Sequence, residues 1–353
     1  MQTRRANVLG LGLIGGSIAL GLRSNGWIVS GEDLSESRQR DALSRGVVDR
    51  IGIDAEAEVT FIAAPVLGVA QLAKRALCET SGVVTDVGSV KSSVVAAIDD
   101  SRFVGGHPMA GSELDGLDGA DGALFHGAVW VLTPTSTTAD TTFSLVAGVV
   151  AELGAEVVAV APERHDQVVA VVSHVPHLAA AALMGLASER AEEHAALLRL
   201  AAGGFRDMTR IASGHPAIWL DICGDNAPAI VDALGGLIDE LGELRTIVAD
   251  HDREGLHRRL SRARDARSNL PIRGARPGEL VEVRVPIPDR PGAAAEVFTL
   301  AADLGVDIAS FEVVHSAEGN RGVAVLLIAK GMGDLFRGGL MARGYRPAVQ
   351  ALQ

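Results

Sequence analysis

The stretch "NVLGLGLIGGSIALGL", residues 7–22, decides the fold of the N-terminal part of this chain. Its glycines follow the pattern G-x-G-x-x-G, directly after a short apolar run and at the start of an amphipathic helical pattern. In such a turn Gly10 permits a tight bend, Gly12 lets the backbone approach a pyrophosphate, and Gly15 lets helix and strand pack closely. The stretch therefore predicts a dinucleotide-binding turn, with a glycine-rich turn that binds no ligand as the alternative.

The residues around this turn indicate which dinucleotide would bind. Leu13 and Ile14 begin the helix, so their free amides would face a phosphate. Asp33 follows a second apolar strand, "WIVSG", and can accept hydrogen bonds from ribose hydroxyls. An acid there would repel a 2′-phosphate, and we expect no arginine beside it. With Ala64 and Pro65 at the end of a later strand flanking the cofactor, the pattern predicts NAD rather than NADP.

Short apolar runs alternate with stretches of helical length as far as residue 160. The predicted strands are "ANVLG", "WIVSG", "EVTFIAA", "GVVTDVG", "FVGG", "AVWVLTP" and "AEVVAVA". Residues 67–77 and 138–153 are two of the helical stretches between them. Because fully apolar strands alternating with helices are typical of a buried, mostly parallel sheet, we predict a doubly wound α/β domain of Rossmann type over residues 1–161.

Two further zones follow. Residues 162–268 lose the strand signal and carry long Ala- and Leu-rich helical patterns, which predict an all-α domain. Helices this apolar are typical of burial on several faces, so we expect a homodimer. Residues 269–279, rich in proline and glycine, predict a linker. Residues 280–353 have the order strand, helix, strand, strand, helix, strand, which is that of a ferredoxin-like βαββαβ unit.

Composition excludes several classes of protein. The 353 residues are 48% hydrophobic and 22% charged, which is typical of a soluble globular protein. A net charge of −12 argues against nucleic-acid binding. Cys78 and Cys223 stand far apart, which favours neither a disulfide framework nor a cysteine-based zinc site and fits a reducing compartment. We find no signal peptide and no uninterrupted apolar stretch of membrane-spanning length, so we expect a cytoplasmic protein without a membrane partner.

Two polar residues stand at predicted strand ends. His107 lies in "GGHPMAGSE", between glycines and a proline, and would either cap a strand or hold an imidazole rigidly at the mouth of the sheet. Ser89 lies in "TDVGSVKSS" and would either project into the same crevice or cap the next helix. The motifs alone leave both pairs of alternatives open.

The helical zone carries two further polar pairs. Ser173 and His177 are spaced i, i+4 in "SHVPHL" and share one helix face, whereas His174 is expected to point elsewhere. No third ligand accompanies these histidines, so we predict no metal. Arg206 and Arg210 are spaced i, i+4 as well, either in surface ion pairs or as a clamp for substrate carboxylates.

Taken together, these motifs resemble one family, the prephenate dehydrogenases and arogenate dehydrogenases of tyrosine biosynthesis. The resemblance covers almost the whole chain. It rests on "GLGLIGGSIALGL", "DVGSVK", "GGHPMAGSE", "LFHGAVWVLTP", "ERHDQVVAVVSHVPHLAA" and "GGFRDMTRIASGHPAIW". The C-terminal zone looks like an ACT domain, a small amino-acid-sensing module, through "PDRPGAAAEV".

The resemblance implies an NAD-dependent oxidative decarboxylation of prephenate to 4-hydroxyphenylpyruvate. His107 matches the catalytic histidine, which takes the hydroxyl proton while hydride leaves the same carbon. Ser89 looks like the residue that positions the hydroxyl and the histidine. Arg210 matches the arginine that holds a substrate carboxylate, and Ser173 and His177 match polar groups that line the pocket.

The resemblance leaves some questions open. Arg206 stands where some members have lysine, which keeps the charge but changes its reach. Arogenate dehydrogenase is an alternative activity, and tyrosine is an expected effector of the ACT-like unit. A non-catalytic NAD- and amino-acid-sensing protein is a further alternative, although it would not need His107, Ser89 and Arg210 together.

Overall fold

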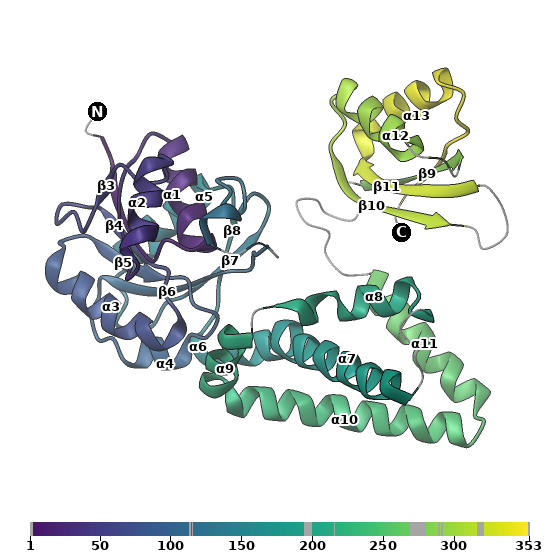
Figure 1. Ribbon diagram of the computed structural model, residues 1–353, viewed down its shortest axis with the longest axis horizontal. Coiled ribbons are helices and arrows are strands. Elements are labelled where there is room, and N and C mark those ends of the chain that lie inside the picture. The colour runs from purple at the N-terminus through teal and green to yellow at the C-terminus, as the bar shows by residue number, and fades with distance from the viewer. Residues whose placement is uncertain are drawn as a thin grey trace. The chain divides into compact units, whose positions relative to one another are not determined.

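Apolar strands and helices alternate in the computed structural model as the sequence pattern predicts (Figure 1). The structure describes residues 3–112, 114, 116–193, 200–214, 216–268, 280–288, 290, 292–315 and 321–351. The predicted linker, residues 269–279, lies outside them. The chain forms two compact units, residues 1–243 and 244–353. The first sheet and most of the helical zone thus belong to one unit, and the predicted limits at 161 and 268 stay predictions.

An eight-stranded sheet organises the first unit. Its strands are β1 (Arg5–Leu9), β2 (Ile28–Glu32), β3 (Arg50–Ile51), β4 (Val59–Ile62), β5 (Val83–Asp86), β6 (Phe103–Pro108), β7 (Val129–Thr133) and β8 (Glu156–Ala159). The order is β3-β2-β1-β4-β5-β6-β7-β8, and every neighbouring pair is parallel except β6 with β7. The mostly parallel Rossmann-type sheet is therefore confirmed. The sequence pattern did not predict β3, because this strand has only two residues, both exposed, and they form no apolar run.

Helices cover both faces of this sheet. They are α1 (Leu13–Ser24), α2 (Glu36–Ser44), α3 (Val66–Glu79), α4 (Ser92–Ala96) and α5 (Asp140–Glu152). Helices α1, α2 and α5 pack into one apolar cluster, and α3 and α4 pack into a second one on the other face (Figure 1). Each buried aliphatic or aromatic side chain contributes about 1.5–3 kcal/mol, so these two layers hold the strand ends, and with them the site, in place.

The helical zone follows. It consists of α6 (Pro162–Val169), the π-helical turn η2 (Ala170–His174), α7 (Val175–Glu193), α8 (Gly203–Thr209), the 3-10 turn η4 (Arg210–Ser213), α9 (Pro216–Asp225), α10 (Ala227–Ala249) and α11 (Arg253–Ser268). Helix α10 crosses the limit between the two units. These elements confirm the helical character predicted for the zone.

One stretch of this zone is more apolar than expected. Residues 162–190 form a single helical run that, by length and composition alone, could cross a membrane, so the expectation of no such stretch is wrong. A core helix of a soluble protein passes the same test. This run carries His165, Asp166 and His174, which are buried and hydrogen-bond to other parts of the fold.

The second unit ends in a four-stranded sheet. Its elements are β9 (Leu280–Pro288), α12 (Ala293–Asp303), β10 (Ile308–His315), β11 (Arg321–Ala329), α13 (Gly333–Ala342) and β12 (Ala348–Ala351). The strand order is β10-β11-β9-β12, with every neighbouring pair antiparallel. Val283, Leu326 and Phe336 lie in the apolar core beneath the helices. The predicted order of strands and helices is confirmed.

Candidate active site

The glycine turn has the geometry of a phosphate cradle. Gly10 has φ +102°, and a Cβ there would lie 2.1 Å from the carbonyl oxygen of Ala63. A Cβ on Gly15 would lie 1.8 Å from the carbonyl oxygen of Gly10, so helix α1 can approach β1 only with glycine there. A Cβ on Gly12, in contrast, would meet no atom of the described residues within 4 Å and would project into open space at the N-terminus of α1. This open space fits a dinucleotide pyrophosphate.

Asp33 lies next to this turn, and it has a partner that we did not predict. Its carboxylate accepts the amide of Leu11 at 2.8 Å and the amide of Ser35 at 2.9 Å. Arg38 also reaches it, at 3.0 Å, because the first turn of α2 brings that side chain back over the end of β2. The expectation that no arginine stands beside Asp33 is therefore wrong. The Asp33 carboxylate would repel a 2′-phosphate at this position, although the guanidinium of Arg38 already lies beside that carboxylate.

The ends of β4 and β5 lie at the same edge of the sheet. The amide of Ala63 donates to the carbonyl oxygen of Leu9 at 2.6 Å, which places Ala64 and Pro65 beside the glycine turn, and Pro65 is the N-cap residue of α3. Ser89 is half-buried in the loop between β5 and α4. Because parallel strands have their carboxyl ends at the same edge of the sheet, Ala64, Pro65 and Ser89 lie at the edge where doubly wound sheets bind ligands.

His107 also stands at this edge, near the end of β6. Its Nδ1 lies 2.8 Å from Nε2 of His165 on α6, and Nδ1 of His165 lies 2.8 Å from Oδ1 of Asp166. Burial and, secondarily, the neighbouring His165 lower the pKa of His107 well below its usual value of 6.5. The ring is therefore neutral at physiological pH, which a general base requires.

Asp166 anchors this chain of hydrogen bonds. Its two carboxylate oxygens accept the amides of Lys91 and Ser92, each at 2.8 Å, at the start of α4. Although burial opposes ionisation, hydrogen bonds from His165, Ser92 and the backbone hold the pKa of Asp166 below its ordinary value. Asp166 is therefore an ionised carboxylate at neutral pH.

A buried ion pair supports the strand that carries His107. Lys91 pairs with Asp86, and both side chains are fully buried. Asp86 also accepts the amide of Gly106 at 3.1 Å and that of Gly88 at 2.8 Å. Burial lowers the pKa of Lys91, while Asp86 opposes that shift. The pair thus ties the end of β5 to the residue just before His107.

Three polar groups of the helical run lie in its π-helical turn or just after it. His174 is buried, and its Nδ1 lies 3.2 Å from Nδ2 of Asn226, which also donates to the carbonyl oxygen of Asp166 at 2.9 Å. His174 ends the π-helical turn η2, whose wider turn shifts side chains from the positions of a regular helix. Ser173 is half-buried in that turn, and His177 stacks on Trp219 with ring centroids 3.6 Å apart.

Burial lowers the pKa of His174 to about 4, so this ring is neutral as well. Because its Nδ1 accepts from Asn226, its proton is on Nε2. That atom is buried and has no hydrogen-bond partner among the residues that the structure describes.

The two arginines lie in separate elements. Arg206 is on α8 and Arg210 begins η4, and both of these elements pack against α7. Both side chains are exposed, and Nε of Arg206 donates to the carbonyl oxygen of Ala201 at 3.3 Å. Their role as a carboxylate clamp stays a prediction. Within the described ranges, no group of three or more His, Cys, Asp and Glu side chains is arranged to hold a metal.

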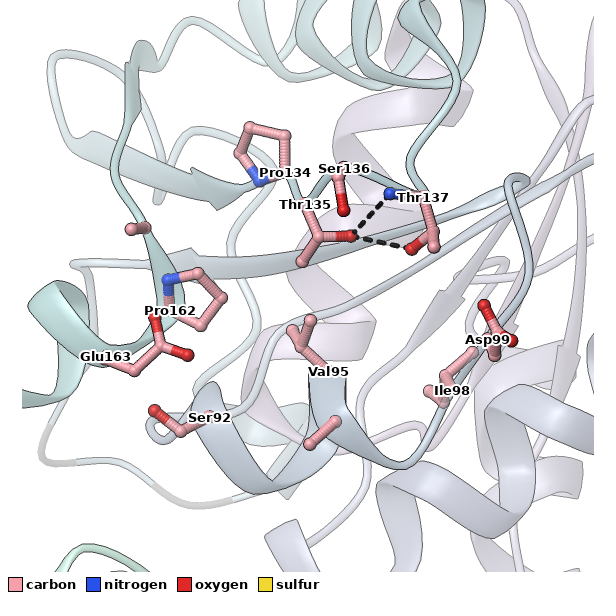
Figure 2. A pocket seen from close by; sticks show the side chains of 12 residues that line it. Ser92, Val95, Ile98, Asp99, Pro134, Thr135, Ser136, Thr137, Pro162 and Glu163 are labelled. Atoms are coloured by element: carbon pink, nitrogen blue, oxygen red, sulfur yellow. Dashed lines mark hydrogen bonds between the residues drawn. The ribbon is translucent and has the colours of Figure 1, made fainter.

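A cavity of about 600 Å³ lies between α4, the turn after β7 and the start of α6 (Figure 2). Its wall carries the hydroxyls of Thr135 and Thr137 and the carboxylates of Asp99 and Glu163. The described residues that line it include no lysine or arginine. Because acidic walls repel anions, this cavity does not suit the carboxylate-bearing substrate that the resemblance implies.

Comparison with known proteins agrees with this geometry. Residues 18–159 match the nucleotide-binding domain of prephenate dehydrogenase, and residues 161–262 match its dimerization domain. The chain belongs to the prephenate and arogenate dehydrogenase family, a family of oxidoreductases. The match to the nucleotide-binding domain supports the predicted NAD-binding fold of this family member.

Individual relatives support the same assignment. Prephenate dehydrogenase of Bacillus subtilis is 37% identical over 332 residues, which are 89% of each chain. Cyclohexadienyl dehydrogenase of Zymomonas mobilis is 32% identical over 74% of this chain and 94% of its own length. The structure of prephenate dehydrogenase from A. aeolicus in complex with hydroxyphenyl propionate and NAD+ is 30% identical, with a TM-score of 0.72, over 77% of this chain and 99% of that one. The structure of arogenate dehydrogenase from Synechocystis is 32% identical, with a TM-score of 0.65, over 75% of this chain and 99% of that one.

The structure also reveals polar residues to which the sequence reading gave no role. These are Asp86, Lys91, His165, Asp166 and Asn226. Some signal was present, because a charged residue at the end of an apolar strand and a His-Asp pair in the first turns of an apolar helix are both unusual. Their partners lie far away in the sequence, so no local pattern shows what each one contacts.

Proposed function

We propose that this chain catalyses the NAD-dependent oxidative decarboxylation of prephenate to 4-hydroxyphenylpyruvate. One observation carries the proposal: a buried, neutral His107 lies at the carboxyl edge of the sheet that carries the glycine turn, in a chain of this family. Ligands of doubly wound sheets bind at this edge. A base near the end of β6 can therefore reach a substrate that lies against a bound dinucleotide.

The chemistry follows from the substrate. Prephenate carries a hydroxyl on the ring carbon opposite its ring carboxylate. His107 accepts the hydroxyl proton, which allows the C–O group to become a carbonyl as hydride leaves that carbon. Bound NAD supplies the acceptor for the hydride. Loss of the ring carboxylate as carbon dioxide then makes the ring aromatic, so the reaction runs in one direction.

The remaining site residues take roles that fit their chemistry. Ser89 positions the hydroxyl and the base, Arg210 and Arg206 bind carboxylates, and Ser173 and His177 line the pocket. The residues that would hold NAD are Gly10, Gly12, Leu13, Ile14, Gly15, Asp33, Ala64 and Pro65.

Substitution of the base tests the proposal. His107→Asn should lower kcat by about 10²- to 10⁴-fold, the usual contribution of a general base, and leave the Kd for NAD unchanged. Steady-state rates with prephenate and with arogenate, each with NAD and with NADP, identify the preferred pair. Full turnover by His107→Asn, or no NAD-linked turnover of either substrate by the unaltered protein, would refute the proposal.

Arogenate dehydrogenase activity is the second candidate, because the arogenate dehydrogenase of Synechocystis is as similar in sequence as the prephenate dehydrogenases of solved structure. A kcat/KM for arogenate above that for prephenate would select it.

The other parts of the chain have proposed roles in assembly and regulation. Exposed apolar side chains on α7, α9 and α10, such as Leu186, Leu220 and Ile238, support a homodimer formed through the helical zone. The antiparallel βαββαβ unit, 280–353, would be ferredoxin-like and ACT-like and would bind tyrosine as an inhibitor. Removal of residues from 280 onward should abolish tyrosine inhibition and keep turnover. A cytoplasmic location fits a biosynthetic enzyme of this kind.

A further inference from the structure

The proton positions along His107, His165 and Asp166 follow from their partners. Both oxygens of Asp166 are within hydrogen-bond distance of backbone amides, at 2.8 Å. An ionised carboxylate can only accept hydrogen bonds. Nδ1 of His165, 2.8 Å from Oδ1 of Asp166, must therefore carry a proton.

The same reasoning extends to the base. When the ring of His165 carries one proton, on Nδ1, its Nε2 is bare and can only accept a hydrogen bond. That atom lies 2.8 Å from Nδ1 of His107, so Nδ1 of His107 must donate to it. The opposite tautomer of His107 would bring two bare nitrogens to hydrogen-bond distance in a buried place, which leaves both unsatisfied.

We infer that His165 and Asp166 are positioning residues that hold His107 in the tautomer with its proton on Nδ1, so that Nε2 is the atom that accepts the substrate proton. This inference rests on the proposed function for its catalytic meaning, although the tautomer itself does not depend on turnover. The arrangement resembles a catalytic triad in its roles: one group reacts, the next orients it, and a carboxylate holds the second.

The proton transfer balances without another reactant. The O–H bond of the substrate breaks and an N–H bond forms at Nε2 of His107, which becomes an imidazolium. Its positive charge is shared through the Nδ1–H···Nε2 hydrogen bond with His165, and the negative charge of Asp166 stabilises it. The proton then leaves to solvent after product release.

The charged surroundings determine how this pair responds to pH. Lys91 faces it from the start of α4 but is paired with Asp86 from β5, and His174 on η2 is neutral near pH 7. A single proton added at low pH can reside on Nε2 of His165. It would then donate to Nδ1 of His107 and force the proton of that ring onto Nε2, which removes the base.

Nitrogen NMR of histidine-labelled protein tests the tautomer directly. Long-range ¹H–¹⁵N spectra distinguish rings protonated at Nδ1 from rings protonated at Nε2, and His107→Asn assigns the His107 signals. We expect the Nδ1–H form for both His107 and His165 at neutral pH, with or without NAD. The Nε2–H form at His107 would overturn the inference, even if the protein proved to be an active dehydrogenase. The Nδ1–H form in a protein that turned over neither substrate would keep the inference about the tautomer and refute the proposed function.

Kinetics test the catalytic role. Asp166→Asn should lower kcat by about 10²- to 10⁴-fold, the range for losing a general base or its correct tautomer. It should also move the acidic limb of the kcat/KM profile to lower pH, because the carboxylate that stabilises the protonated pair is gone. His165→Gln keeps an oxygen that can accept from His107, so it should retain at least about tenfold more activity than His165→Leu.

Glu163→Gln is the matched control, since Glu163 lies exposed in the first turn of the same helix, α6. It should leave kcat and the acidic limb unchanged. A purely structural role for Asp166 would lower its thermal stability and kcat without moving the acidic limb. An unmoved limb in Asp166→Asn, or equal activity of the Gln and Leu variants at His165, would therefore overturn the positioning role.

Discussion

Acidification should destabilise the first unit through His174. The pKa of this ring is about 4 in the fold against 6.5 for a free histidine, because burial opposes its charged form. A histidine whose pKa is lowered on folding binds more protons when unfolded, so stability falls as pH drops through 6.5 and continues to fall until about 4. Integrating between about pH 7 and about pH 5 gives a loss of up to about 2 kcal/mol from this ring.

Urea denaturation at the two pH values measures this loss. All three tryptophans, Trp27, Trp130 and Trp219, lie in the first unit, so their fluorescence reports its unfolding. His174→Gln removes the titrating ring and should reduce the pH-dependent loss by up to about 2 kcal/mol relative to the unaltered protein. His126→Gln, at an exposed position of the same unit, should leave the loss unchanged. Equal losses in the unaltered protein and in His174→Gln would refute the reasoning, because they would mean that folding does not keep this ring neutral.

Five further substitutions test the cofactor turn and its support. Gly12→Ala should keep the thermal stability, because its Cβ enters the open space beside the turn. It should abolish NAD binding in a fluorescence titration, because that Cβ occupies the space expected for the pyrophosphate. Gly15→Ala should lower Tm, because its Cβ would lie 1.8 Å from the carbonyl oxygen of Gly10. Asp33→Asn should raise the ratio of kcat/KM for NADP over NAD by about 10- to 100-fold, since charged hydrogen bonds contribute about 1.5–3 kcal/mol and Arg38 is then released to a 2′-phosphate. A second change, Arg38→Ala, should reverse that gain, and an unchanged ratio in Asp33→Asn would contradict the role of this pair. Lys91→Met should lower the free energy of unfolding, measured by urea denaturation, by about 3–5 kcal/mol, because it leaves the buried carboxylate of Asp86 without its cation. A decrease below about 1 kcal/mol would show that the ion pair is dispensable for stability.

The fold of this chain could be predicted to a large extent from local patterns. Apolar runs bounded by glycine and helical stretches predicted the strands of the first sheet except β3, and the same signals predicted the order of elements in 280–353. The glycine turn was predicted for the same reason. The close contact of Gly15 with the carbonyl oxygen of Gly10 lies within the turn and follows from local spacing, whereas Gly10 meets Ala63, 53 residues further along the chain.

The surroundings of the site, in contrast, depend on residues that meet only in the folded protein. His107 and His165 are 58 residues apart and come together because α6 packs against the edge of the sheet. Arg38 reaches Asp33 through the turn of α2, and His174 meets Asn226, 52 residues further along the chain. The sequence by itself therefore determined the sheet and the glycine turn, and its resemblance to the family led to His107 as the proposed base. Only the tertiary structure decided which groups hold that base, because hydrogen bonds depend on distances between side chains that no local pattern contains.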